Sequence, residues 1–354
     1  MKKIIKFNNG KEISENSPCF IIAEAGVNHN GDIKIAKKLV DMAVECKADA
    51  VKFQSFFTDE VIIKKAPKAK YHIETTGDDN VQTWYNLIKS TEMDLKMHKD
   101  IVKYCKKKKI IFISTPYDFK SVDLLNRLNV EIIKIASTDT NNHPLIKYIS
   151  KKNKPIILST AMSNLNEVSE SFEIIKKYSK KPVVLMQCTG NYPAPRYDSN
   201  LRVINGYKKK FKSLVGYSDH VLGNDAALAA ISIGASVYEK HITIDKKLPG
   251  PDHRTSMNKN EFKILVNKIR DLEKILGKEK KQVMDSELEN RKILRKFIVT
   301  KRDLIKGKKI SQKDISIKRT GGKGLEPKMF EKILERRTKK IIPKDTPLTL
   351  NMLK

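Results

Sequence analysis

Eight short apolar segments in this chain end in polar residues, and seven of them run directly into a helix-like segment. The segments are 20–26, 51–54, 110–115, 132–137, 156–160, 183–189, 214–220 and 237–243. Strands that alternate with helices build parallel sheets, and eight such units with polar carboxyl ends are typical of a TIM barrel. The sequence therefore predicts an α/β fold, a TIM (β/α)8 barrel whose active site lies at the eight strand ends.

The rest of the chain exceeds what a barrel needs, since a barrel takes about 250 residues and this chain has 354. Residues 1–18 resemble a short hairpin before the first barrel strand, and 55–90 reads as a long polar loop that shapes the substrate pocket or a lid. Strand-like pieces at 297–300, 315–318 and 340–342 alternate with turn signals. We therefore expect a barrel domain over 1–280, a linker over 281–294 and a small, mostly β domain over 295–354.

The charge balance is strongly basic, with 71 Lys and Arg against 41 Asp and Glu and a net charge of +30. The lysines are scattered along helical segments without interleaved aromatic residues, so we expect a solvated surface and no nucleic-acid partner. Such a field would favour an anionic substrate. The start of the chain shows no signal peptide and no segment has 18 apolar residues, which predicts a cytoplasmic protein without a membrane partner. The four cysteines lack CxxC spacing and read as reduced thiols.

Three of the predicted strands carry polar residues two positions apart, which places each pair on one face. The pairs are Lys52 with Gln54, Ser218 with His220, and Glu239 with His241. Apolar residues of barrel strands face the surrounding helices, so the polar pairs are expected to face the interior mouth.

His220 and His241 end the seventh and eighth strands, which are neighbours in a barrel. Two imidazoles so placed could share a divalent metal, with water and substrate oxygens as further ligands. The alternative is one acid–base histidine and one structural histidine, because metal sites usually take three protein ligands.

Lys52 and Lys134 end the second and fourth strands, and two ammonium groups at one mouth need anions nearby. Hydroxyl donors follow on the same rim, namely Thr115, Ser137, Ser159 and Ser218. This set favours a phosphate or carboxylate ligand. Two alternatives stay open: a Schiff-base lysine as in aldolases, and an ion pair of a lysine with Glu24 or Glu239.

Other polar residues follow the remaining strand ends. Glu24 ends the first strand and could act as a base or accept a sugar hydroxyl. Asn191 and Tyr192 follow the sixth strand and offer an amide and a phenol to a polar substrate. Asp252 lies in a Gly- and Pro-rich loop after the eighth strand, where an aspartate is more often a turn former.

Nine motifs in order carry a resemblance to a known family. They are IAEAGVNHNG (22–31), VKFQ (51–54), STPYD (114–118), KIAS (134–137), ILSTAM (157–162), QCTGNYP (187–193), GYSDH (216–220), EKHIT (239–243) and PGPDH (249–253). The chain resembles the sialic acid synthases, which are nonulosonate synthases that condense phosphoenolpyruvate with an N-acylated hexose. KRTGGKG (318–324) resembles the signature loop of their C-terminal antifreeze-like (SAF) domain.

The resemblance implies a role for each matching residue. It implies a manganese or magnesium site at His220 and His241, and proton transfer by Glu24 or Asp139. The phosphoenolpyruvate-binding set would be Lys52, Thr115, Lys134, Ser137, Ser159, Asn191 and Ser218. The sugar-binding set would be Gln54, Tyr192 and Asp252 together with Glu24, and Arg319 of the small domain would also contact the substrate. Two departures from the family pattern concern local geometry: Thr138 replaces a glycine, and Thr320 stands where a proline is common.

The reaction expected from this resemblance joins phosphoenolpyruvate to N-acetylmannosamine and gives N-acetylneuraminate and phosphate. An alternative acceptor is 2,4-diacetamido-2,4,6-trideoxymannose, which gives N,N'-diacetyllegionaminate. A Schiff-base aldolase and an RNA-binding protein are the competing functions from other classes. The resemblance also implies a domain-swapped homodimer in which each small domain caps the barrel of its partner.

Overall fold

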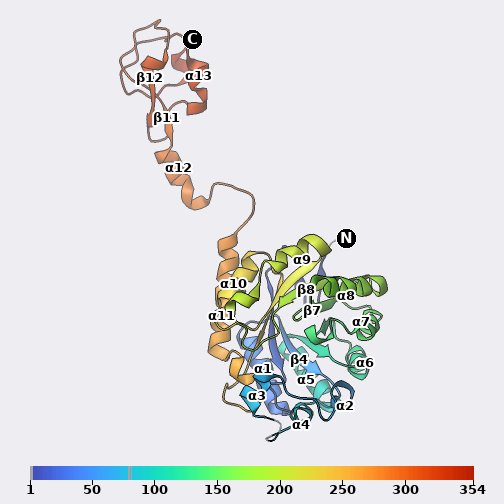
Figure 1. Ribbon diagram of the computed structural model, residues 1–354. Helices are drawn as coiled ribbons and strands as arrows, with labels where there is room; N and C mark the ends of the chain where they lie inside the picture. The colour runs from blue at the N-terminus through green and yellow to red at the C-terminus, as the bar shows by residue number, and fades with distance from the viewer. Residues whose placement is uncertain (1–2, 79, 81) are drawn as a thin grey trace. The chain divides into compact units, whose positions relative to one another are not determined.

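The computed structural model describes residues 3–78, 80 and 82–354, and its centre is a parallel sheet of eight strands (Figure 1). The strands are β3 (Phe20–Gly26), β4 (Ala50–Ser55), β5 (Ile111–Pro116), β6 (Ile133–Ile135), β7 (Ile156–Ser159), β8 (Val183–Cys188), β9 (Leu214–Asp219) and β10 (Val237–His241). The first and last of these, β3 and β10, pair with each other. The hydrogen-bonded order runs from β5 round to β6, and these two edge strands contact each other. The sheet is thus a nearly closed barrel, and the predicted fold class is confirmed.

Helices follow the strands and cover the outside of the barrel (Figure 1). They are α1 (Ile33–Glu45), α5 (Leu95–Lys108), α6 (Phe119–Arg127), α7 (His143–Ser150), α8 (Leu165–Tyr178), α9 (Val203–Phe211), α10 (Asp225–Ser232) and α11 (Lys259–Leu276). Short polar side chains begin several of them: Asp94 caps α5 and Asp118 caps α6, each by accepting a backbone N–H. Such caps satisfy donors that the first helical turn leaves unpaired.

The barrel interior is built in layers because alternate strand residues point inward. The lower layers are apolar, with Phe20, Ile22, Ile111, Ile113 and Met186 in one buried cluster. The N-terminal hairpin of β1 (Ile5–Lys6) and β2 (Glu12–Ile13) adds Ile5, Phe7 and Ile13 to the same cluster. The hairpin therefore closes the amino-terminal end of the barrel, and the opposite end is left for polar residues.

The segment after β4 is not the long polar loop that the sequence predicts. It contains three short helices, α2 (Thr58–Val61), α3 (Lys70–Thr76) and α4 (Trp84–Ser90), which lie together in Figure 1. Aromatic rings order this segment: Tyr71 and His72 lie 3.9 Å apart between centroids, and His72 stacks on Trp84 at 4.0 Å. Helices of four to seven residues are too short to show a helical period in sequence.

A second compact unit begins at Lys278, after the barrel unit ends at Gly277. Its first α-helix is α12 (Leu288–Leu294), and β11 (Lys296–Thr300) then pairs antiparallel with β12 (Ile315–Arg319). A short helix, α13 (Phe330–Ile333), contributes Ile333 to a small core with Ile298, Leu304 and Leu348. The piece predicted as a strand at 340–342 makes only one bridge, between Leu304 and Ile342, because turns flank it closely.

Two general expectations concern the chain as a whole. Cys19, Cys46, Cys105 and Cys188 are all buried and none forms a disulfide. Among the residues that the structure describes, no helix combines the length and the apolar character that a membrane crossing requires.

Candidate active site

The top interior layer of the barrel is polar, in contrast to the apolar layers beneath it. Glu24, Lys52, Thr115, Lys134, Ser159, Ser218, Glu239 and His241 are all buried at the carboxyl ends of their strands. Strand pairing sets their order: Glu24 lies level with Lys52 on one side and with His241 on the other. The ring of strand ends predicted from sequence therefore converges on one place.

Two lysines and two glutamates form a continuous buried cluster in this layer. Lys52 Nζ lies 2.9 Å from Glu24 Oε1 and 3.6 Å from Glu239 Oε1. Lys134 Nζ donates to both oxygens of Glu239 at 2.8 Å. Thr115 and Ser218 extend the cluster, since Lys52 Nζ donates to Thr115 Oγ1 at 3.1 Å and Ser218 Oγ donates to Glu239 Oε1 at 3.2 Å. Both ion pairs that the sequence left as an alternative are present.

The electrostatics of the cluster differ between its two carboxylates. Burial alone would raise the pKa of Glu239, but the charges of Lys134 and Lys52 lower it to about 2. Burial raises the pKa of Glu24 even though Lys52 lies beside it. Glu239 is therefore a fixed negative charge, whereas Glu24 accepts a proton more readily than an exposed glutamate does. Burial lowers the pKa of Lys134, and the two glutamates raise that of Lys52 against the effect of burial.

Gly26 keeps a space open beside this cluster. Its φ of +52° lies in the left-handed region, and a β-bulge between Glu24 and Gly26 shifts the register there. A Cβ at this position would lie 3.3 Å from Glu24 Oε1 and 3.5 Å from both Gln54 Nε2 and His241 Cε1. Gln54 Nε2 itself donates to Glu24 Oε1 at 3.4 Å. The left-handed backbone and these close contacts favour glycine where three predicted site residues converge.

The two histidines lie next to each other at the same mouth, with ring centroids 5.7 Å apart. His220 Nδ1 lies 2.6 Å from the carbonyl oxygen of Thr189, which can only accept, so Nδ1 carries the proton and Nε2 keeps a lone pair, with Cys188 Sγ 3.9 Å away. His241 Nδ1 is buried without a hydrogen-bond partner. Burial lowers the pKa of His220 to about 4, and burial together with the neighbouring His220 lowers that of His241 well below its usual value, so both rings are neutral at pH 7.

Aromatic residues and Asp252 surround the imidazoles. The Tyr192 ring lies 3.9 Å from His220 and 5.6 Å from His241 between centroids. Tyr71 of α3 lies 5.2 Å from Tyr192, so the segment between β4 and α5 reaches the mouth. Asp252 Oδ2 lies 3.8 Å from His241 Nδ1. Burial and the charge of Glu24 raise the pKa of Asp252 to about 7. This aspartate is thus a buried carboxyl at the mouth, not a surface turn former.

The remaining predicted residues divide into two groups. Ser159 Oγ and Asp139 Oδ2 are buried without a partner, while Asp139 Oδ1 accepts from Asn142 at 2.9 Å. Ser137 Oγ accepts the backbone N–H of Ala161 at 3.0 Å. In contrast, Asn191 is exposed, and its Oδ1 accepts only the N–H of Tyr192. Arg319 is exposed at the end of β12 in the second unit.

Sequence analysis placed Glu239 at the mouth and left open its ion pair with a lysine, and in the structure it bridges both lysines. Two other residues of the site, Gly26 and Tyr117, were missed. Gly26 was part of a quoted motif, but no pattern indicated the space that it opens. Tyr117 was also within a quoted motif, and the charges of Glu24 and Asp139 add to burial in raising its pKa well above the usual value.

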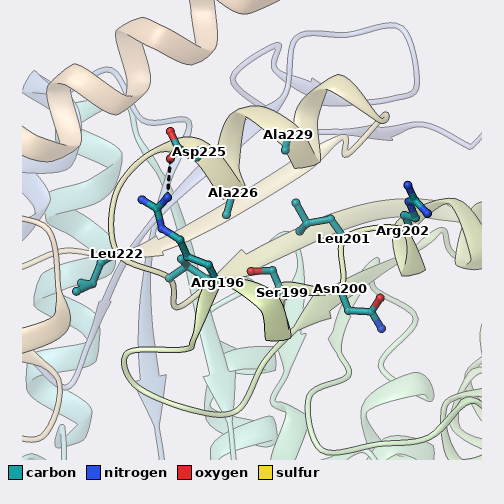
Figure 2. A pocket seen from close by; sticks show the side chains of 10 residues that line it. Arg196, Ser199, Asn200, Leu201, Arg202, Leu222, Asp225, Ala226 and Ala229 are labelled. Carbon is teal, nitrogen blue, oxygen red and sulfur yellow. Dashed lines mark ion pairs between the residues drawn. The ribbon is translucent and has the colours of Figure 1, made fainter.

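A separate cavity of about 430 Å³ lies beside the mouth, between α10 and the start of α9 (Figure 2). Its lining includes Arg196, Ser199, Val221 and Asp225, and Arg196 pairs with Asp225 at 3.1 Å. None of the residues predicted from sequence lines this cavity.

The donor set at the mouth fits a divalent cation that takes part of its shell from elsewhere. Among the described residues, no group of three or more His, Cys, Asp and Glu side chains is arranged to hold a metal. Two neutral imidazoles, one with a lone pair on Nε2 and one with an unpartnered Nδ1, nevertheless offer two ligands. Oxygen atoms of water or substrate would have to complete the shell.

Comparison with known proteins assigns both parts of the chain to known families. Residues 39–281 match the NeuB family, and residues 295–354 match the SAF domain. The chain is 44% identical over 316 residues to an N,N'-diacetyllegionaminic acid synthase of Campylobacter jejuni, covering 89% of this chain and 94% of that protein. It is 33% identical over 319 residues to the N-acetylneuraminate-9-phosphate synthase of Homo sapiens, covering 90% and 88%.

A solved structure is similar as well. The crystal structure of an N-acetylneuraminic acid synthetase from Leptospira borgpetersenii, in complex with citrate, aligns with a TM-score of 0.72 and 34% identity. The alignment covers 82% of this chain and 95% of that one. On these matches, the chain belongs to the NeuB family of nonulosonate synthases and carries a C-terminal SAF domain.

Proposed function

We propose that the protein condenses phosphoenolpyruvate with an N-acylated hexose and water, forming a nonulosonic acid and inorganic phosphate. The observation that carries this proposal is the buried cluster of Lys52, Lys134, Glu24 and Glu239 at the barrel mouth. In the reaction, C3 of phosphoenolpyruvate bonds to the aldehyde carbon of the open-chain sugar. Water adds at C2, the bond from C2 to the phosphate oxygen breaks, and phosphate leaves.

The lysines and hydroxyls would hold the anionic groups of phosphoenolpyruvate. Lys52 and Lys134 supply positive charge, and Thr115, Ser218 and the unpartnered Ser159 hydroxyl lie on the same rim. Charge-assisted hydrogen bonds to phosphate and carboxylate are the strong ones and fix the geometry of the ligand. Glu239 keeps both lysines in place, because its lowered pKa makes it a permanent counter-ion.

Glu24 is the carboxyl that we propose for proton transfer at C2. Its raised pKa lets it take a proton from an attacking water, and its Oε2 is buried without a partner. Asp139 also has a pKa that burial raises, but Asn142 holds one of its oxygens. Tyr192, Gln54 and Asp252, which contact His220, Glu24 and His241 at the mouth, would contact the sugar.

His220 and His241 would hold a divalent cation, Mn²⁺ or Mg²⁺. When bound, such an ion supplies Lewis-acid polarisation of an aldehyde oxygen. The contribution of the chain itself is to keep both rings neutral and to fix the tautomer of His220, because its Nδ1–H donates to the carbonyl oxygen of Thr189 and Nε2 keeps its lone pair.

For the acceptor sugar, similarity favours 2,4-diacetamido-2,4,6-trideoxymannose. The diacetyllegionaminic acid synthase is more similar to this chain than the human N-acetylneuraminate-9-phosphate synthase, at 44% against 33% identity. N-acetylmannosamine, with N-acetylneuraminate as the product, is the second candidate. We further propose that the protein is a homodimer in which Arg319 contacts substrate.

Phosphate release from phosphoenolpyruvate, measured with each sugar in the presence of Mn²⁺, tests the proposal. We expect release only when an N-acylated hexose is present, with a product mass equal to sugar plus pyruvate. His220→Ala should abolish release while the protein stays folded, and chelation should inactivate the wild type reversibly. A borohydride-trapped pyruvate adduct on a lysine would point instead to an aldolase, and no release with any sugar would overturn the proposal.

A further inference from the structure

A second buried ion pair lies on the outer face of the barrel, directly behind the two histidines. Lys240 Nζ lies 3.2 Å from Asp219 Oδ2, and the side chains are only 2% and 0% exposed. Asp219 precedes His220 and Lys240 precedes His241, so each histidine points inward where its neighbour points outward. Lys240 and Asp219 are also direct partners in the pairing of β10 with β9.

The contacts of this pair extend to the residue that follows His220. Lys240 Nζ donates to the carbonyl oxygen of Val221, and Asp219 Oδ1 accepts the N–H of Val221 at 2.8 Å. Tyr238 OH donates to Asp219 Oδ2 at 2.7 Å. The backbone of His220 is therefore held from both sides, while Ala194 N–H donates to its carbonyl at 2.9 Å.

Such a pair is costly to bury, so its role needs an explanation. Removing two charges from water carries a penalty that their attraction repays only when the geometry and further hydrogen bonds are good. Apolar residues fill the rest of the outer face, with Tyr217, Tyr238 and Val215 in one cluster. An apolar pair would serve packing equally well there. What an apolar pair would not supply is the set of bonds to Val221 that ends β9 in one defined conformation.

We propose that Asp219 and Lys240 are positioning residues that set the separation and direction of the His220 and His241 rings for a divalent cation. This inference rests on the proposed metal site and deepens it. The pair touches neither substrate nor metal and acts through the backbone of the two strand ends. Outer-shell groups of this kind typically change metal affinity by about 10- to 100-fold.

The cavity in Figure 2 lies next to this pair, because Val221 is part of its lining. Val221 itself is buried, so the bonds from Asp219 and Lys240 fix a buried backbone segment at the wall of that cavity.

The test measures Mn²⁺ binding to the full-length protein by electron paramagnetic resonance of free Mn²⁺. Lys240→Met keeps the aliphatic stem and removes the ammonium group, and Asp219→Asn keeps the shape. The double variant Asp219→Asn/Lys240→Met leaves no unpaired buried charge, so it should fold even where a single variant does not. We expect all folded variants to bind Mn²⁺ about 10- to 100-fold more weakly, while phosphoenolpyruvate binding without metal stays as in wild type.

Asp49→Asn is the matched control. Asp49 lies at the amino-terminal end of the barrel, where it accepts from Arg270 at 2.9 Å and from Ile21 N–H at 2.8 Å. It should lower stability without changing Mn²⁺ affinity. If wild type binds Mn²⁺ and the double variant binds it equally well, the positioning role is wrong and the metal site stands. If wild type itself binds no Mn²⁺, the metal site is wrong and the inference falls with it. Equal loss of metal and phosphoenolpyruvate binding would indicate general disruption and would also overturn it.

Discussion

At the scale of single residues, Lys134 and Lys52 carry the clearest expectation. Each lysine is held by a glutamate and faces the mouth, so replacement by methionine removes a charge from the proposed anion site. Losing one charge-assisted contact costs about 1.5–3 kcal/mol. We therefore expect Lys134→Met and Lys52→Met to weaken phosphoenolpyruvate binding in calorimetry by about 10- to 150-fold and to leave sugar binding nearly unchanged.

Lys134→Met leaves Glu239 short of a counter-ion, so a second variant is needed to separate weaker binding from misfolding. The double variant Lys134→Met/Glu239→Gln removes that excess charge and should still bind phosphoenolpyruvate weakly. Lys152→Met is the matched control, since Lys152 pairs with Asp123 at 2.6 Å on the outside of the barrel. A loss confined to sugar affinity would contradict the assignment of the two lysines.

A second residue-scale prediction concerns stability in acid and His29. This ring is fully buried, and Nδ1 accepts the N–H of Gly31 at 3.0 Å. Burial, with the nearby His98 and His253, lowers the pKa of His29 to about 3. The unfolded chain binds a proton near pH 6.5, so the stabilising contribution is complete above that pH and is lost as the pH falls toward 3.

Between pH 7 and pH 5, this one group should account for about 2 kcal/mol of lost stability. His29→Asn keeps an acceptor near Gly31 but does not titrate, so the loss over this interval should shrink by about that amount. Urea unfolding at both pH values measures the difference. The control is His143→Asn, because the His143 side chain is 42% exposed. This variant should keep the wild-type difference in stability between the two pH values. An unchanged difference in His29→Asn would show that this ring is not the source.

At the scale of elements, the caps of the helices are testable one at a time. Asn258 begins α11 with a capping box: its Oδ1 accepts from Glu261 N–H at 3.0 Å, and Glu261 Oε2 accepts from Asn258 N–H at 2.9 Å. Asn258→Ala should reduce the free energy of unfolding by about 1 kcal/mol. Asn267→Ala, an exposed position inside the same helix, should be neutral or slightly stabilising because alanine is the better helix former. Equal effects at both positions would argue against the cap.

How far the sequence predicts these elements depends on how local their causes are. The strand β3 was predicted to the residue, because a local apolar run ending in polar residues marks it. The helices after β4 were missed, since their order comes from aromatic contacts such as Tyr71 with Tyr192. Alternation also predicts that Lys52 and Glu239 face inward. It does not predict that they meet, because barrel closure through β3 and β10 brings those strands together.

At the scale of the whole molecule, the division after Gly277 separates the predicted site residues into two units. All but Arg319 belong to the barrel, and Arg319 is exposed at the end of β12. The second unit has a small core of its own around Ile298 and Leu348, and domains of this size have limited stability alone. A contribution of Arg319 to the reaction therefore depends on which barrel its unit serves.

Subunit mixing decides this question. In the proposed homodimer Arg319 serves the barrel of the partner, so Arg319→Ala and His220→Ala chains, each inactive alone, should regain activity when mixed. One barrel of each mixed dimer then has intact histidines and an intact arginine from the other chain. Up to a quarter of wild-type activity is expected, because about half of the dimers are mixed and each has one complete site. If Arg319 serves its own barrel, neither site in a mixed dimer is complete. A monomer in sedimentation, or no recovery after confirmed subunit exchange, would rule out the swapped arrangement while leaving the chemistry of the barrel untouched.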